Sequence, residues 1–142
     1  MNRLVSPAAG PPVKGSMPLR GEPDIVMSRQ TVRKLAQELK FSLVDQTKMV
    51  TAASELSRNT VVYGGGGEMT WEVVAQGLRT GLRLRFVDQG PGIPDLDKAL
   101  TDGWTSGKGL GVGLSGSKRL VNEFSIDTEV GRGTCVTITR WK

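Results

Sequence analysis

Apolar residues recur at helical spacing in two stretches of the first half of the chain. The first stretch begins at Asp24, a residue type that favours the helix N-cap, and its apolar face continues through Val32 to about Lys40. The second begins with Ser42-Leu-Val-Asp45, which has the form of a capping box, and the glycine run Gly64–Gly67 is expected to end it. The pattern therefore predicts two successive helices.

Alternating apolar and polar residues indicate strands after the glycine run. Residues 69–73 and 82–87 alternate, and Gly77–Gly81 is predicted to be the turn between them. Upstream, residues 16–23 can add a short strand. Pro18 confines that strand to a sheet edge, because proline lacks the N–H group that an inner strand donates.

The second half of the chain combines a long connection, a helix and a final hairpin. Residues 93–108 form the connection, which has room for one short helix. A third long helix is marked by Leu114, Leu120, Val121 and Phe124. The hairpin strands contain residues 126–130 and 134–141, and Gly131–Gly133 is the turn that joins them.

Helices combined with antiparallel pairs and few parallel crossovers are typical of an α+β protein. We expect a two-layer sandwich in which a mixed, mostly antiparallel sheet carries helices on one face. Residues 1–15 hold three prolines, two glycines and few bulky apolar residues, so we expect a disordered leader. Residues 16–142 then form a single domain of ordinary size.

Composition removes several classes of function. The chain has no histidine, which excludes histidine-based catalysis, most zinc sites and the phospho-accepting half of a histidine relay. Its single cysteine, Cys135, rules out an internal disulfide and fits a cytoplasmic protein. No apolar run approaches the ~20 residues of a membrane helix. The net charge is +5, but no aromatic ladder interleaves the scattered basic residues, so nucleic acid is not expected as a partner.

Glu55 and Asn59 place an acid and an amide on one helix face. They are four residues apart, so both project from the same side of the second helix, beside its apolar stripe. A carboxylate there can accept a proton from a hydroxyl, and an amide oxygen can ligate Mg²⁺, which prefers oxygen donors. Such pairs are also common on ordinary helix surfaces, so the pair alone leaves both interpretations open.

Asp88 is predicted to enter the core side of the sheet at the end of a strand. Strand side chains alternate, so Asp88 shares a face with Leu82, Leu84 and Phe86. A buried carboxylate needs a hydrogen-bond donor. Two kinds of donor remain open, namely an adenine amino group and the backbone N–H groups of the next turn.

Two features flank this strand end. Gly90 and Gly92 allow the backbone to turn tightly beside whatever the carboxylate holds. Thr134 follows the last glycine turn and shares a strand face with Val136 and Ile138, so its hydroxyl can reach the same cavity. A threonine chosen only for its strand propensity explains that position equally well.

A glycine-rich segment precedes the third helix. Gly109, Gly111 and Gly113 lack side-chain bulk where the helix begins, which leaves backbone N–H groups free to bind phosphates, with Lys108 as a further contact. The segment Gly111–Gly116 also fits the dinucleotide pattern G-x-G-x-x-G. A dinucleotide fold requires a strand directly before that pattern, and none is predicted there.

These segments, in this order, resemble the ATP site of the GHKL superfamily, named for gyrase, Hsp90-type chaperones, histidine kinases and MutL. The matching segments are Glu55–Asn59, Asp88–Gly92, Gly107–Leu114 and Gly131–Thr134, within a resemblance over about residues 24–142. It implies the Bergerat ATP-binding fold. The segments Ala53–Asn59, Asp88–Asp95 and Gly109–Leu114 resemble most the small switch-protein serine/threonine kinases and anti-sigma factors, above all the RsbT type.

The resemblance implies ATP and Mg²⁺ as cofactors and a serine or threonine of a STAS-domain protein as the phosphorylation target. RsbT-type members also bind and activate a PP2C-type phosphatase in the stress-response signalling of the stressosome. Two other functions remain open. One is an anti-sigma factor that sequesters a sigma factor, and the other is a nucleotide-binding switch without phosphoryl transfer.

Residue roles follow from the resemblance by position. Glu55 is implied as the general base for the attacking hydroxyl, Asn59 as the Mg²⁺ ligand and Asp88 as the acceptor for the adenine amino group. The other implied residues of the adenine pocket are Gly90, Gly92 and Thr134. The implied phosphate lid consists of Lys108, Gly109, Leu110, Gly111, Val112 and Gly113. Lys108 stands where such lids have a small residue.

Overall fold

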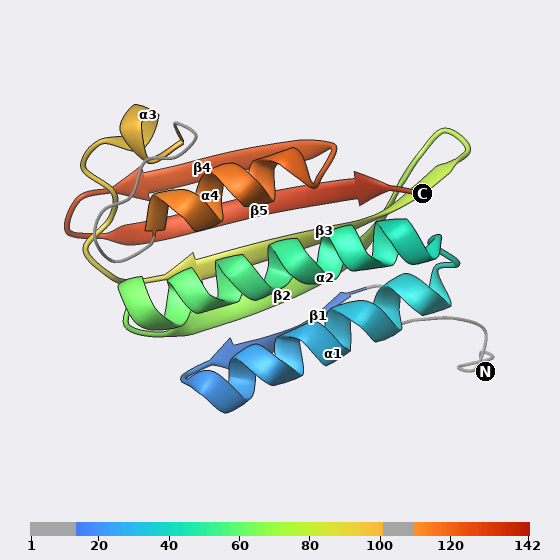
Figure 1. Cartoon of the computed structure of the whole chain (residues 1–142), viewed down its shortest axis with the longest axis horizontal. Helices are drawn as coiled ribbons and strands as arrows, with labels where there is room; N and C mark the ends of the chain where they lie inside the picture. The colour runs from blue at the N-terminus through green and yellow to red at the C-terminus, as the bar shows by residue number, and fades with distance from the viewer. Residues whose placement is uncertain (1–13, 101–109) are drawn as a thin grey trace, which may run out of the picture.

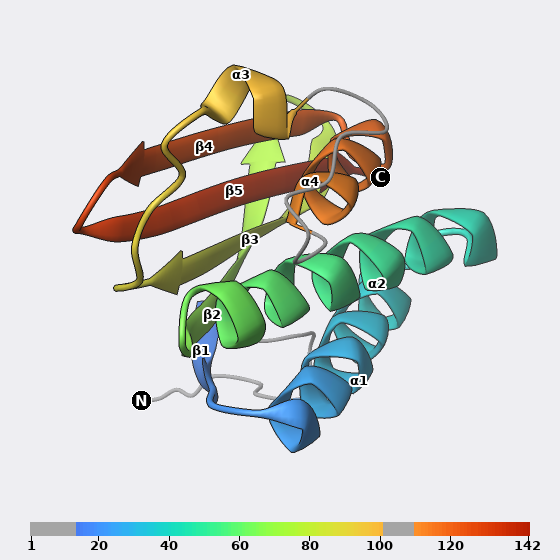
Figure 2. The same cartoon turned by 60° about the vertical axis from the view of Figure 1, so that its left-hand side comes forward.

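The computed structural model describes residues 14–100 and 110–142, with residues 110–113 as backbone only. Five strands form one sheet, and the long helices cover one of its faces (Figure 1). In chain order the elements are β1 (Lys14–Leu19), α1 (Glu22–Glu38), α2 (Leu43–Arg58), the π-helix η2 (Asn59–Tyr63), β2 (Gly67–Gln76), β3 (Arg79–Asp88), α3 (Leu96–Ala99), α4 (Leu110–Arg119), β4 (Glu123–Glu129) and β5 (Gly133–Trp141). The predicted two-layer α+β sandwich is confirmed, and Figure 2 shows its layers from the side.

The strand order is β1-β2-β3-β5-β4, and every described pair is antiparallel. The expectation that the sheet is mixed is therefore wrong for the described residues. The two hairpins, β2–β3 and β4–β5, supply antiparallel pairs by themselves, and α3 and α4 lie between them so that β5 joins β3. The predicted edge strand is confirmed as β1. It begins at Lys14, inside the range expected to be a leader, because Lys14 and Gly15 pair with Glu72 and Trp71.

The sequence predicted an N-cap for each of the first two helices, and the structure confirms the N-cap of α2 only. The Ser42 hydroxyl accepts a hydrogen bond from the Asp45 amide at 3.1 Å, so the predicted cap of α2 is confirmed. The predicted N-cap at Asp24 is wrong, because Gly21 caps α1 and a proline occupies its first turn. Asp24 instead pairs with Arg20 at 2.9 Å.

Two boundaries in the second half also differ from the sequence-based expectation. The turn between β2 and β3 is shorter than Gly77–Gly81, and Gly81 lies inside β3, where a Cβ atom would come 2.8 Å from the Trp141 ring. The third helix ends at Arg119, so the predicted continuation to Phe124 is wrong. Phe124 lies on β4 opposite Ile138, since alternation toward the core outweighs helical spacing there.

The core lies between the inner face of the sheet and the helices. Its fully buried side chains include Ile25, Val32, Met49, Leu56, Met69, Leu82, Leu84, Phe86 and Ile138. A buried chain of hydroxyls joins the first two helices, because Ser57 bonds to Ser28 at 2.9 Å and Ser28 donates to the Ile25 carbonyl at 2.7 Å. None of the described helices is long and apolar enough to cross a membrane.

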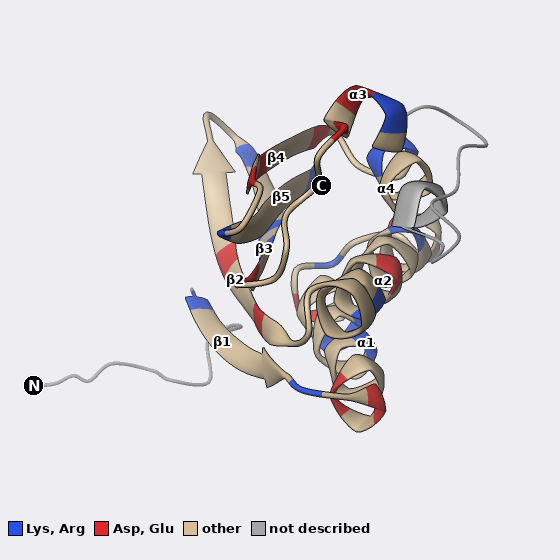
Figure 3. Ribbon diagram, turned by 90° about the vertical axis from the view of Figure 1, so that its left-hand side faces the viewer, with Lys and Arg blue, Asp and Glu red and all other residues tan. Residues whose placement is uncertain are grey.

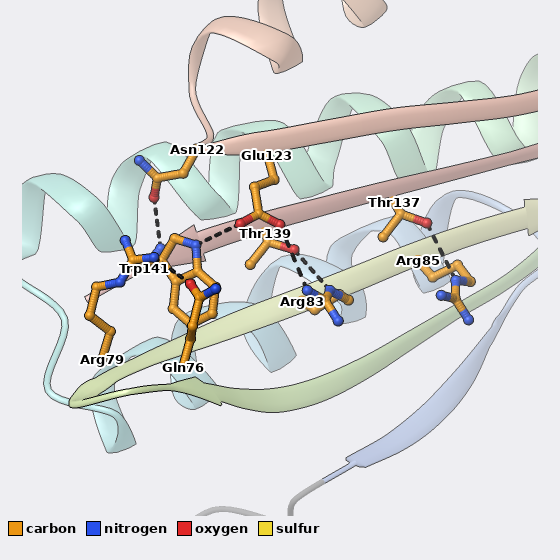
Figure 4. A network of polar contacts seen from close by, with 9 residues as sticks. All are labelled: Gln76, Arg79, Arg83, Arg85, Asn122, Glu123, Thr137, Thr139 and Trp141. Carbon is orange, nitrogen blue, oxygen red and sulfur yellow. Dashed lines mark hydrogen bonds and ion pairs between the residues drawn. The ribbon is translucent and has the colours of Figure 1, made fainter.

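The outer face of the sheet is polar, and hydrogen bonds and ion pairs join its side chains near the C-terminus (Figure 4). The Trp141 indole N–H donates to Glu123 at 2.8 Å, and the Arg79 guanidinium lies 4.5 Å from the Trp141 ring centroid. Arg83 donates to Thr139 at 3.0 Å. Lys, Arg, Asp and Glu occur on both layers of the molecule, as Figure 3 shows, so charge does not mark one layer as the functional one.

Asp45 and Arg140 form an ion pair that ties α2 to β5. Their side chains approach to 2.6 Å and are 27% and 15% exposed. The hydrogen bond from Arg140 lowers the pKa of the Asp45 carboxyl, against a smaller opposing effect of burial. A group whose pKa is lower in the folded than in the unfolded protein stabilises the fold at a pH above its unfolded pKa. This contribution is lost as the pH falls through the folded pKa.

Asp45→Asn should therefore destabilise the fold at neutral pH. We expect a loss of about 1–2 kcal/mol in the free energy of unfolding, because Arg140 keeps its charge without an acidic partner. The difference from wild type should shrink in acid, as the pH falls through the lowered folded pKa and the wild-type carboxyl is protonated as well. Urea unfolding at both pH values measures it, and an equal difference at both would contradict the ion-pair explanation.

Candidate functional site

One cavity between α2 and the inner face of the sheet brings three predicted site residues together. Asn59 of η2, Asp88 of β3 and Thr134 of β5 line it. Its other walls are Leu56, Thr60, Tyr63, Phe86, Ile93, Leu114 and Val136. The cavity measures about 20 Å³, which is about the room that one water needs. A purine therefore fits only after the lining side chains separate.

A larger cavity of about 470 Å³ also borders Asp88 and Thr134. It opens at the end of the sheet between β3 and the β4–β5 turn, and it includes Val87 and Cys135, which face outward from the sheet. We place the site in the smaller cavity, because only that one combines Asp88 and Thr134 with Asn59.

Asn59 stands where the helical path changes. The α-helix ends at Arg58, and the Gly64 amide bonds to the Asn59 carbonyl at 3.0 Å, which closes a π turn. The carboxamide nitrogen of Asn59 is buried and has no hydrogen-bond partner among the described residues. An unsatisfied buried polar group costs about 1–3 kcal/mol, and π turns are frequent at functional sites. Both features favour a ligand-binding role for Asn59.

Asp88 is the last residue of β3 and lies on its inner face, as predicted. One carboxylate oxygen accepts the Gly90 amide at 2.9 Å, so the Asx interpretation is confirmed. Burial raises the pKa of the Asp88 carboxyl, while hydrogen bonds from the backbone N–H groups of Gly90 and Thr134 oppose that rise. A carboxylate has about four acceptor sites, so these bonds leave acceptor capacity for an amino group.

Glycines allow close backbone approaches around Asp88. A Cβ atom on Gly64 would lie 2.6 Å from the Asp88 Cβ, and one on Gly133 would lie 2.9 Å from the Asp88 carbonyl carbon. A Cβ on Gly90 would lie 2.7 Å from the Gly64 Cα. Gly92 has a φ of +78°, and its Cβ would come 2.8 Å from the Glu129 carbonyl carbon. Side chains at these positions would push the walls of the cavity apart.

Glu55 lies on α2, one helical turn before Asn59, and is half-buried. It is not among the residues that line the cavity. Within the part of the chain that the structure describes, no hydrogen bond or ion pair engages its carboxylate. The structure thus places it near the cavity without binding it to another group.

The glycine-rich segment is only partly visible. Lys108 and Gly109 lie outside the described residues, and Leu110–Gly113 form the first turn of α4. Helix N-termini bind anions through free backbone N–H groups. Leu114, in the next turn, lines the cavity, so the start of α4 lies near it.

Several residues at the cavity escaped the sequence analysis. Tyr63 follows Asn59 by four residues and Thr60 follows Leu56 by four, and this helical spacing was the available signal. Gly64 was interpreted only as part of a helix stop. Ile93 and Thr128 had no local signal, because their roles depend on strand pairing and loop position.

Comparisons with known proteins agree with this geometry. Residues 44–142 match the family of histidine kinase-, DNA gyrase B- and HSP90-like ATPases. The chain is 47% identical over 118 residues to the serine/threonine-protein kinase RsbT of Bacillus subtilis (strain 168), covering 83% of this chain and 89% of that protein. It is 24% identical over 120 residues to the anti-sigma F factor of Thermoanaerobacter sp. (strain X514), covering 80% and 82% of the two chains.

A solved structure supports the fold. The mycobacterial sensor histidine kinase MprB matches with a TM-score of 0.55 at 18% identity, over 91% of this chain and 97% of that one. The fold, the arrangement of the cavity and the close relative therefore agree on one assignment. The chain belongs to the histidine kinase-, DNA gyrase B- and HSP90-like ATPase family and, within it, to the serine/threonine-protein kinases of the RsbT type.

Proposed function

We propose that this kinase binds Mg²⁺-ATP in the cavity between α2 and the sheet and phosphorylates a serine or threonine of a STAS-domain regulatory protein. The observation that carries the proposal is the shared cavity of Asn59, Asp88 and Thr134, which come from three separate elements. The 47% identity to a serine/threonine-protein kinase supports the transfer reaction.

The adenine side of the site consists of Asp88, Gly90, Gly92 and Thr134. The Asp88 carboxylate accepts a hydrogen bond from the adenine amino group, and the two glycines allow the loop to lie close to it. The phosphate side consists of the first turn of α4, Leu110–Gly113, together with Lys108 and Gly109. The free N–H groups at this helix start favour phosphate oxygens.

Asn59 is the proposed protein ligand for Mg²⁺, through its carboxamide oxygen. Among residues 14–100 and 110–142, no cluster of three or more acidic or cysteine side chains could hold a metal ion by itself. Mg²⁺ usually binds through one or two protein groups together with phosphates. When bound, it neutralises charge that develops on the transferred phosphoryl group.

Glu55 is the proposed general base. It accepts the proton of the attacking hydroxyl, which is a poor nucleophile at neutral pH. The carboxylate is half-buried and unengaged among the described residues, so it is available for that proton. Positioning supplies most of the remaining acceleration in phosphoryl transfer.

We also propose a PP2C-type phosphatase as a second binding partner, activated by contact. An anti-sigma function, in which the chain sequesters a sigma factor, is the alternative that the 24% identity to an anti-sigma F factor supports. Incubation with labelled ATP and the STAS proteins of the same genome tests the kinase proposal. A pull-down that recovers a sigma factor and no STAS protein would favour the alternative.

Asn59→Ala tests the metal role directly. We expect the affinity for Mg²⁺-ATP to fall about tenfold, because a ligand and a hydrogen-bonding amide are lost, while binding of metal-free ATP changes little. Calorimetric titrations with Mg²⁺ and with a chelator measure both. Asn122→Ala serves as the matched control, since Asn122 bonds to Trp141 at the other end of the sheet. An equal loss with and without metal would remove Asn59 from the metal site.

A further inference from the structure

Thr128 joins the two sides of the cavity that carry Asp88 and Thr134. It is the register partner of Thr134 across β4 and β5, and Thr134 is the partner of Asp88 across β5 and β3. The three residues therefore form one row across the inner face, at the end of the sheet where Figure 2 shows β3 ending beside the β4–β5 turn.

The Thr128 hydroxyl makes three polar contacts at this end of the sheet. The Thr128 oxygen accepts the Ile93 amide at 2.9 Å, so it holds the loop that follows Asp88. It also lies 2.9 Å from the Thr134 hydroxyl and 3.3 Å from the Gly133 carbonyl. Ile93 and Thr134 both line the small cavity, whereas Thr128 lines the larger cavity beside it.

Hydrogen-bond accounting leaves two directions for the bond between the hydroxyls of Thr128 and Thr134. A hydroxyl has one proton and two lone pairs. With one lone pair of Thr128 occupied by Ile93, its proton goes to Thr134 or to Gly133. Thr128 can donate to the Gly133 carbonyl at 3.3 Å and accept from Thr134 on its second lone pair. Alternatively, Thr128 donates to Thr134 at 2.9 Å and leaves the longer contact to Gly133 unmade. In the second arrangement Thr134 keeps its own proton for a group in the cavity.

The second arrangement gives the cavity a carboxylate acceptor beside a hydroxyl donor. Adenine matches this pair with an amino donor beside the ring nitrogen N1, which is an acceptor. Guanine reverses both, since it carries an oxygen acceptor and an N–H donor at these positions. The row across the sheet is thus complementary to adenine.

We propose that Thr128 is a positioning residue for adenine recognition, on the premise that the chain binds ATP as proposed above. In the proposed state the Thr128 hydroxyl donates to Thr134 and holds the Thr134 hydroxyl in the rotamer that donates to N1, and it also holds the Ile93 peptide against the cavity. Without that partner, the Thr134 side chain spreads over its staggered rotamers. Thr128→Val removes both bonds at nearly constant volume, and Thr128→Ser keeps them.

Titrations with three nucleotides separate this role from a general loss of structure. We expect wild type and Thr128→Ser to prefer ATP about tenfold over 1-deaza-ATP, which has a C–H group in place of N1. In Thr128→Val the preference should fall to about twofold. The preference for ATP over purine riboside triphosphate, which lacks the amino group read by Asp88, should be the same in all three proteins.

The outcomes are distinguishable. A wild-type protein that binds ATP and 1-deaza-ATP equally, or a Thr128→Val protein with the wild-type preference, would overturn the inference and leave the proposed function intact. A wild-type protein that does not bind ATP would overturn the proposed function itself. Hydrogen exchange of the Ile93 amide, without any nucleotide, gives a second readout. It should be faster in Thr128→Val and unchanged in Thr128→Ser, and unchanged exchange in Thr128→Val would contradict the positioning role.

Discussion

Glu55→Ala should abolish phosphorylation while leaving ATP binding intact. A general base contributes about 10²–10⁴-fold to the rate, so we expect a loss of that size in the transfer rate. Glu55 lies outside the residues that line the cavity, so the dissociation constant for ATP should change less than twofold. Transfer of labelled phosphate to the STAS protein and calorimetric titration of ATP measure the two effects.

Glu38→Ala is the matched control for this prediction. Glu38 is exposed at the end of α1, on a different helix from the cavity residues, and the substitution removes the same carboxylate. It should leave both rate and affinity unchanged. Wild-type phosphorylation in the Glu55 variant would refute the base assignment, and loss of ATP binding there would show that Glu55 belongs to the nucleotide pocket.

Asp88→Asn should lower the affinity for ATP about 100-fold. In the proposed site, the charged acceptor for the adenine amino group becomes a neutral amide, and hydrogen bonds to charged groups contribute about 1.5–3 kcal/mol. Titration with ATP measures the loss. Asp127→Asn is the control, because Asp127 lies on the adjacent strand pair with its side chain on the exposed outer face. Equal affinities of the Asp88 variant and wild type would place Asp88 outside the pocket.

The same substitution should not destabilise the fold. Burial raises the pKa of the Asp88 carboxyl in the folded protein. The contribution of this group to the free energy of unfolding is therefore full at a pH below its unfolded pKa, and it is lost as the pH rises through the folded pKa. At neutral pH the ionised carboxylate is therefore a cost that asparagine removes, while the amide oxygen still accepts the Gly90 N–H. The midpoint of thermal unfolding should be equal to or above that of wild type, and a lower midpoint would contradict the role of burial.

The elements around the proposed ATP site were largely predictable from the sequence because their signals are local. Alternation along β3 placed Asp88 on the inner face, and a capping motif placed the start of α2 at Ser42. Helical spacing put Glu55 and Asn59 on one side of α2. The order of these motifs was sufficient to indicate the family.

Local signals failed where two patterns overlapped. Leu120, Val121 and Phe124 fit a helical stripe, yet Phe124 belongs to β4, because pairing with Ile138 buries it against the core. Gly81 resembled a turn residue, although it lies within β3 beneath the Trp141 ring. In both cases a partner distant in sequence decided the conformation.

The sequence by itself determined the fold class, the antiparallel hairpins and the inward direction of Asp88, because hydrophobic periodicity and capping act over a few residues. Only the tertiary structure decided that Asn59, Asp88 and Thr134 share a cavity, that Gly64 packs against Asp88, and that Thr128 supports Thr134. These contacts depend on the register of β3, β5 and β4 and on how α2 packs over them. The hairpin turn sets the register of β4 against β5, whereas β3 and β5 are distant in sequence, so no local pattern specifies how they pair.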